Sequence, residues 1–226
     1  MAAVELSQTR LATDANLVSY WKLESNYTDE KGNNTLTAQG SGNSFVSAKF
    51  NNGLSVNGSG YASVTSSGMP TGNTSFTAHV WAKFNSATPA GLNMPISWGN
   101  VGSASNQTYI YENTDGKIHA SAGGSAELVS TTTVSAGVFY ALDLTWDGTN
   151  ARLYVNGSQE ASSTPGSRSG VAGAVGLGAG VYGTPAFFMS GVVDDAAVFN
   201  RALTSDEVNG LANGFPLDTA KFFAFF

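Results

Sequence analysis

The feature that most constrains the fold is a series of Asn-Gly and Asp-Gly dipeptides that divides the chain into short segments. Such dipeptides supply the positive φ angles that tight hairpin turns need. They lie at positions 52–53, 57–58, 115–116, 147–148 and 156–157. The segments between them are rich in β-branched and aromatic residues. This spacing predicts many short antiparallel strands.

The clearest hairpin joins residues 142–146 to residues 151–155, because each segment alternates large apolar with polar side chains and ends in its own turn dipeptide. We expect further strands over 17–23, 53–57, 61–65, 75–84, 94–98, 108–111, 117–120, 139–146 and 192–199. Many short strands at this spacing are typical of a sandwich. The predicted fold is therefore all-β, with two antiparallel sheets.

One segment near the C-terminus predicts a helix. Thr204 and Glu207 have the spacing of a capping box, in which each side chain accepts a hydrogen bond from the other residue's backbone N–H. Val208 and Leu211 give the segment an apolar face, and Gly214 ends it. We expect one short C-terminal helix beside the sandwich.

Composition excludes several classes of function. The chain has 226 residues, with 10 Lys and Arg against 16 Asp and Glu, so it lacks the cationic surface that neutralises phosphates, and nucleic acid is not expected as a partner. It has no cysteine, which removes disulfides, thiolate catalysis and zinc sites of the Cys type. His79 and His119 stand far apart, so any metal should be a hard cation held by oxygen. The first 20 residues contain no apolar run of the length that a signal peptide or a membrane span requires.

Both ends of the chain fall outside the predicted sandwich. Residues 1–16 form a polar arm, residues 17–214 the domain, and residues 215–226 an apolar tail. Such a tail would aggregate unless something covers it. We expect it to bind a neighbouring subunit, as part of a homo-oligomer, through four side chains: Phe222, Phe223, Phe225 and Phe226. The alternative is that the tail folds back over an edge or groove of its own domain.

Several motifs follow one another along the chain. They are YWKLE at 20–24, GLSVNG at 53–58, SFTAHVWAK at 75–83, LTWDG at 144–148, LYVNG at 153–157 and FMSGVVDD at 188–195. The set resembles the LamG-like branch of the concanavalin A-like lectin/glucanase superfamily found in bacteria and phages. The resemblance implies two curved sheets packed face to face as a jelly roll. Asn57, Asp195 and Ala197 depart from the residues common in the family, which weakens any family site that uses those groups.

Glucanases of this superfamily place their acids at alternate positions of one strand, because retaining hydrolysis needs two carboxyl groups about 5 Å apart. That spacing is missing here. Glu112 and Asp115 bracket a turn, and Asp143 stands alone in its strand. Asp194 and Asp195 are adjacent, so we expect them to point to opposite faces of their strand. We expect no enzymatic activity.

Asp194 and Asp195 lie in an otherwise apolar strand, where carboxylates are costly unless they are paired or bind a cation. In calcium-binding members of the superfamily an aspartate at this motif acts together with an acid near the first strand. The resemblance therefore implies Asp194, Glu24 and Asp29 as ligands of Ca²⁺, which takes six to eight oxygens. The alternative is that Asp194 caps a turn or pairs with Arg201.

Trp98 differs from the other three tryptophans, which have apolar neighbours two positions away and are expected in the core. It lies at a strand end beside Asn100, where an aromatic ring can stack on a sugar. Tyr109, Tyr111 and Tyr182 are the other candidates for a carbohydrate platform. The alternative is that these rings only pack against the protein.

Two functions follow from these features. The first is a non-catalytic structural subunit, such as a virion decoration protein or a filament protomer, that assembles through its termini. The second is a carbohydrate-binding or adhesion module that recognises a surface glycan. Carbohydrate-binding domains usually accompany a larger enzyme or anchor, whereas this chain is one domain with two short ends, so the sequence favours the first. Either function places the protein on an extracellular surface or a virion.

Overall fold

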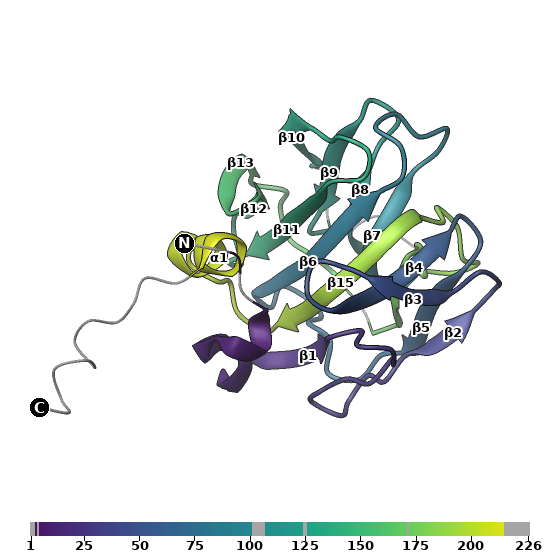
Figure 1. Ribbon diagram of the computed structural model, residues 1–226. Coiled ribbons are helices and arrows are strands. Elements are labelled where there is room, and N and C mark those ends of the chain that lie inside the picture. The colour runs from purple at the N-terminus through teal and green to yellow at the C-terminus, as the bar shows by residue number, and fades with distance from the viewer. Residues whose placement is uncertain (1–2, 4, 101–106, 124–125, 171, 215–226) are drawn as a thin grey trace, which may run out of the picture.

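Two antiparallel sheets pack face to face in the computed structural model, which describes residues 3, 5–100, 107–123, 126–170 and 172–214 (Figure 1). The all-β jelly-roll sandwich expected from the sequence is confirmed, including its single short α-helix near the C-terminus. The predicted assembly residues Phe222, Phe223, Phe225 and Phe226 lie outside the described residues.

The first sheet has eight strands. Seven follow the order β13-β12-β11-β6-β15-β4-β3, and β1 pairs with β15 beside this path. The strands are β1 Leu17–Trp21, β3 Ser44–Ser47, β4 Asn52–Asn57, β6 Phe76–Phe84, β11 Phe139–Trp146, β12 Ala151–Val155, β13 Ser158–Ser163 and β15 Ser190–Phe199.

The second sheet has seven strands in the order β10-β9-β8-β7-β14-β5-β2. The strands are β2 Thr37–Gln39, β5 Tyr61–Thr65, β7 Asn93–Gly99, β8 Gln107–Glu112, β9 Lys117–Ser121, β10 Leu128–Thr133 and β14 Ala174–Leu177. Alternate side chains of both sheets fill the space between them. In β11, for example, Leu142, Leu144 and Trp146 belong to this core, whereas Asp143 points to the outer face.

Three helices cover the outer face of the eight-stranded sheet: η1 Leu6–Gln8, η2 Arg10–Thr13 and α1 Ser205–Asn213 (Figure 1). Their apolar side chains form a second buried cluster with that face, which contains Leu6, Leu11, Leu17, Tyr20, Tyr154, Ala197, Phe199, Leu203, Val208 and Leu211. Leu6 and Leu11 of the polar arm expected at residues 1–16 therefore pack on the chain's own domain.

A β-bulge in β15 also corrects the expectation that Asp194 and Asp195 point to opposite faces. Val193 and Ala196 on either side both belong to the core, so the two acids share the outer face. Asp195 adopts a positive φ of 45° at this bulge. Its carboxylate accepts the Leu6 N–H at 2.9 Å, which ties the N-terminal segment to the sheet.

The capping box predicted for α1 is present in full. The Thr204 hydroxyl accepts the Glu207 N–H, and the Glu207 carboxylate accepts the Thr204 N–H. Arg201 binds Asp14 and Glu207 and so joins the helix to the N-terminal segment. No helix in the described part of the chain has both the length and the apolarity needed to cross a membrane.

Candidate functional site

The outer face of the seven-stranded sheet carries a row of polar and aromatic side chains. Along β8, Tyr109 and Tyr111 point to this face, while Ile110 between them belongs to the core. The strand register places Ser121 and His119 of β9 directly beside the two tyrosines. The three described helices contact the other sheet, so none of them covers this face.

The loop between β14 and β15, residues 178–189, folds back over part of the same face. The Ser97 hydroxyl donates a hydrogen bond to the Ala179 carbonyl at 2.9 Å and accepts the Val181 N–H at 3.2 Å. Gly176 leaves room for the loop, because a methyl group there would lie 2.4 Å from the Val181 side chain. The loop is therefore anchored on the sheet in a fixed position.

Four aromatic side chains lie in series on this face, and we call them the aromatic strip: Tyr111, Tyr109, Tyr182 and Phe187. The ring centroids of Tyr111 and Tyr109 are 5.7 Å apart, and those of Tyr109 and Tyr182 are 5.9 Å apart. Tyr182 and Phe187 both lie beside Gly180, where a methyl group would be 3.2 Å from each side chain. The strip thus joins strand β8 to the β14–β15 loop.

Phe187 is held in an unfavourable backbone conformation. Its φ is 56°, and its side chain is exposed, with 42% of its surface accessible. The left-handed conformation costs an L-residue roughly 1–2 kcal/mol. Two hydrogen bonds between Gly180 and Ala186 close the loop beside it. Strain that the surrounding structure imposes concentrates at functional sites, and here it directs an aromatic ring toward solvent.

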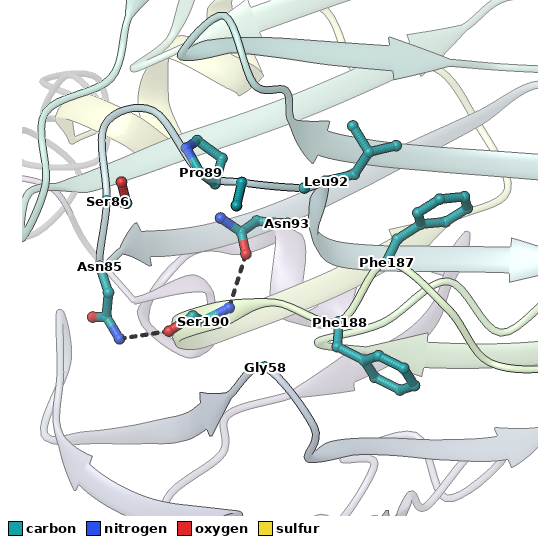
Figure 2. Close-up of a pocket in the computed structure, with 11 residues that line it drawn as sticks. Gly58, Asn85, Ser86, Pro89, Leu92, Asn93, Phe187, Phe188 and Ser190 are labelled. Carbon is teal, nitrogen blue, oxygen red and sulfur yellow. Dashed lines mark hydrogen bonds between the residues drawn. The ribbon is translucent and has the colours of Figure 1, made fainter.

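A pocket of about 480 Å³ opens beside Phe187 (Figure 2). It lies where the loop between β6 and β7 meets the β14–β15 loop and the turn at Gly58. The apolar side chains that line it are Pro89, Ala90, Leu92, Phe187 and Phe188, and the polar ones are Asn85, Ser86, Asn93 and Ser190. This mixture of rings, amides and hydroxyls suits a ligand that has both apolar faces and many hydroxyl groups.

Hydrogen bonds fix the amides of the pocket (Figure 2). The Asn85 side-chain amide donates to the Ser190 hydroxyl at 3.0 Å, and the side-chain amide oxygen of Asn93 accepts the Ser190 N–H at 2.9 Å. The Asn93 amide nitrogen donates to Glu112 at 2.7 Å. Burial raises the pKa of Glu112 to about 7, although the Asn93 hydrogen bond opposes this shift. The pocket is therefore preorganised by a chain of contacts that ends on a buried acid.

The far end of the strip is acidic. The Tyr111 hydroxyl donates to Glu127 at 2.6 Å, and the His119 ring stacks on Tyr111 with 5.2 Å between centroids. One nitrogen of His119 lies 3.1 Å from Glu127 and the other 3.2 Å from Asp115. Burial, together with the charge of Glu127, raises the pKa of Tyr111 and of Tyr109. These phenols keep their protons. The Tyr111 hydroxyl uses its proton on Glu127 and can accept a hydrogen bond from a ligand.

The structure brings together three of the five predicted carbohydrate-binding residues and separates the other two. Trp98 is 2% exposed and packs edge-on against Phe76 in the core, which corrects its expected role as a platform because neither ring face is free. Asn93 begins β7 at the pocket, and Asn100 follows the last residue of the same strand. The seven residues of β7 therefore place Asn100 roughly 20 Å from the pocket.

The three predicted calcium ligands do not form one site. Asp29 accepts four backbone N–H groups, from Tyr20, Lys31, Asn33 and Asn34. In the described residues no three His, Asp or Glu side chains are placed to hold a metal together. Burial, with the charges of Asp195 and Glu24, raises the pKa of Asp194 to about 8, and one Asp194 oxygen is buried without a partner in the described structure. Calcium at Asp194 and Glu24 stays a prediction, and Asp29 does not fit it.

Sequence reasoning missed Phe187, the pocket amides Asn85 and Asn93, and Glu127. Phe187 and Phe188 form a pair of aromatic residues in a loop that also contains glycine and proline, and that pair was the signal available in the sequence. The amides and Glu127 gave no such signal, because their placement depends on how three loops meet.

The sequence matches the family described as the concanavalin A-like lectin/glucanases superfamily over residues 56–209. The chain belongs to this superfamily. Its matched region includes the aromatic strip and most of both sheets. No curated protein sequence matches this superfamily member.

Three solved structures share the superfamily fold of this chain. Domain 4 of the extracellular arabinanase AbnA from Geobacillus stearothermophilus, solved in complex with arabinotriose, has a TM-score of 0.70 at 17% identity, covering 88% of this chain and 98% of that domain. The binding domain of Paraclostridial Mosquitocidal Protein 1 has a TM-score of 0.68 at 16% identity, covering 89% of this chain and 56% of that one. The CBM40 of the Ruminococcus gnavus IT-sialidase, bound to α2,3 sialyllactose, has a TM-score of 0.54 at 19% identity, covering 62% of this chain and 83% of that one. At these identities the likeness shows the fold alone.

Proposed function

We propose that the chain is a carbohydrate-binding module that holds a glycan across the aromatic strip and the adjoining pocket. The observation that carries this proposal is the convergence of four rings from two separate segments on one face, the last of them strained and exposed at the pocket. Aromatic faces stack on the apolar faces of sugar rings. Fixed amides and hydroxyls bind the sugar hydroxyls and set their orientation.

The solved neighbours support this function over the structural subunit that the sequence favoured. The arabinanase domain is described in complex with arabinotriose, the sialidase domain with sialyllactose, and the toxin domain as a binding domain. None of these three is described as a virion or filament protein. The arabinanase is extracellular, and we place this chain outside the cell on the same grounds.

We also propose that the module is non-catalytic, although some neighbours are parts of enzymes. Hydrolysis of a glycosidic bond needs two carboxyl groups that flank the bond. Among the described residues that line the pocket there is no aspartate or glutamate. Glu112 lies below the pocket, where its carboxylate is hydrogen-bonded to Asn93.

A pair of variants tests the proposal against an oligosaccharide array that includes arabinotriose, followed by calorimetry on the best ligand. Tyr109→Ala and Phe187→Gly are each expected to weaken binding at least tenfold. Phe187→Gly should leave the melting temperature almost unchanged, because glycine relieves the positive φ while the exposed ring is lost. Val138→Ala is the matched control, since Val138 is 46% exposed and precedes β11 of the other sheet.

Two results would contradict the proposal. One is a wild-type protein that binds no oligosaccharide on the array. The other is an affinity that Tyr109→Ala and Phe187→Gly lower no more than Val138→Ala does.

A further inference from the structure

An acid, Glu127, is hydrogen-bonded to the aromatic strip, and the His119 ring that stacks on Tyr111 lies between Glu127 and a second acid, Asp115. The Glu127 carboxylate accepts the Tyr111 hydroxyl, and its charge also acts on Tyr109. Its side chain is 40% exposed, so it faces the same solvent as a bound ligand would. Asp115 lies beyond it on the other side of His119.

Most of the positive charges of the chain lie away from the strip. Of its 10 Lys and Arg residues, seven have partners away from the strip: Arg10 with Glu207, Lys22 with Glu30, Lys49 over Trp81, Lys83 over Phe139, Arg152 with Asp147, Arg168 over Phe76 and Arg201 with Asp14. Lys31 lies in the loop after β1, and Lys221 falls outside the described residues. The sequences of residues 101–106, 124–125 and 171, which lie outside the described residues, contain no Lys or Arg.

Lys117 is the cation that shares the outer face of β9 with His119. Lys117 begins β9 at the β8–β9 hairpin, so it lies two residues further along β9 from Tyr109 than His119 does. Its backbone N–H donates a hydrogen bond to the Asp115 carboxylate at 2.9 Å, and its charge also acts on that carboxylate. Lys117 therefore offsets Asp115 and leaves Glu127 as the charge in contact with the strip.

We infer that the strip selects glycans by charge, accepting uncharged sugars and rejecting those that carry carboxylates, with Glu127 as the residue that determines this specificity. The inference rests on the proposed function. A carboxylate on a sugar that stacks on Tyr109 or Tyr111 would approach Glu127 at short range, with no Lys or Arg of the described residues between them. Like charges a few ångströms apart at a partly buried site repel strongly enough to cost a factor of ten or more in affinity.

Three forms of one ligand test the inference. The first is the neutral oligosaccharide that the array shows to bind best. The second is the same molecule with its primary hydroxyls oxidised to carboxylates, and the third is the methyl ester of the second, which restores neutrality at the same size. We expect the ester to bind within about threefold of the parent, and the acid at least tenfold more weakly than the ester.

Two changes should reduce the difference between acid and ester. Glu127→Gln removes the charge and keeps an acceptor for Tyr111, so the ratio should fall toward one. Salt at 1 M shortens the Debye length to about 3 Å and should also lower the ratio. Glu30→Gln is the matched control, because Glu30 is an exposed acid in the loop after β1 and its loss changes the net charge equally.

The outcomes separate the two proposals. If the acid binds as tightly as its ester, or if the best ligands on the array are acidic, the charge selection is overturned while glycan binding stands. If Glu127→Gln leaves the difference in affinity between acid and ester unchanged, Glu127 does not determine the specificity. If no oligosaccharide binds, the proposed function fails first.

Discussion

At the scale of single residues, the buried acids of this chain hold the backbone in place. Asp29 is the clearest example, because its two oxygens accept four backbone N–H groups within one loop and the neighbouring strand β1. A carboxylate used in this way is structural whether or not a cation is present. Its function is therefore measurable as stability.

We predict that Asp29→Ala lowers the free energy of unfolding by about 2–4 kcal/mol, because it leaves buried N–H groups without acceptors. Urea unfolding in calcium and in chelator should give the same loss. Glu30→Ala, next to it in the loop, is the control and should cost less than about 0.5 kcal/mol, since its side chain is exposed. A loss seen in calcium but absent in chelator would make Asp29 a metal ligand instead.

Residue-level reasoning found the three tyrosines of the strip, because aromatic residues in a polar context are visible in the sequence. It placed Trp98 wrongly, since the side of a strand on which a ring lies depends on register, and one position of shift moves every side chain to the other face. A bulge had the same effect at Asp195, where a positive φ put two adjacent acids on one face. Such local irregularities leave no periodic signal.

At the scale of elements, the strands that the sequence predicted are those with large apolar residues next to turn dipeptides, such as β11 and β12. Five short strands were not predicted: β2, β3, β10, β13 and β14. Four of them are rich in Ser, Thr and Gln, and β14 has only four residues, so pairing with stronger neighbours decides their conformation. The position of the β14–β15 loop could not be predicted from the sequence either. It depends on contacts with Gly176, which is near in the chain, and with Ser97, which is 84 residues from Val181.

The short helix η1 attaches to the domain mainly through one residue, Leu6. Leu6 is fully buried under the outer face of the eight-stranded sheet, and its N–H binds Asp195. We predict that Leu6→Ala lowers the free energy of unfolding by about 2–5 kcal/mol, through lost burial and the cavity that remains. Gln8→Ala, on the exposed side of the same helix, should cost less than about 0.5 kcal/mol. Equal losses in the two variants, measured by urea unfolding, would mean that the N-terminal segment does not dock as described.

At the scale of the whole molecule, the two outer faces of the sandwich differ in what covers them. Helices η1, η2 and α1 cover the eight-stranded sheet and bury its acids, whereas the seven-stranded sheet presents the aromatic strip (Figure 1). The proposed glycan site thus lies on the sheet opposite to the one that the helices cover. Changes to the terminal segments should therefore alter stability or assembly without altering affinity for a glycan.

The C-terminal tail provides the last prediction. Helix α1 is closed by the Gly214 N–H, which donates to the Gly210 carbonyl at 2.8 Å, and the described contacts of both sheets are complete by this residue. Ending the chain after Gly214 should change the melting temperature by less than about 2 °C and leave glycan affinity unchanged.

Each phenylalanine that the tail buries against a neighbour would contribute about 1.5–3 kcal/mol, so the truncated chain should run as a monomer where the full chain assembles. Light scattering after size exclusion measures this, with a full-length control in which Phe222, Phe223, Phe225 and Phe226 are each changed to Ser. Lost stability with an unchanged oligomeric state would show instead that the tail covers its own domain.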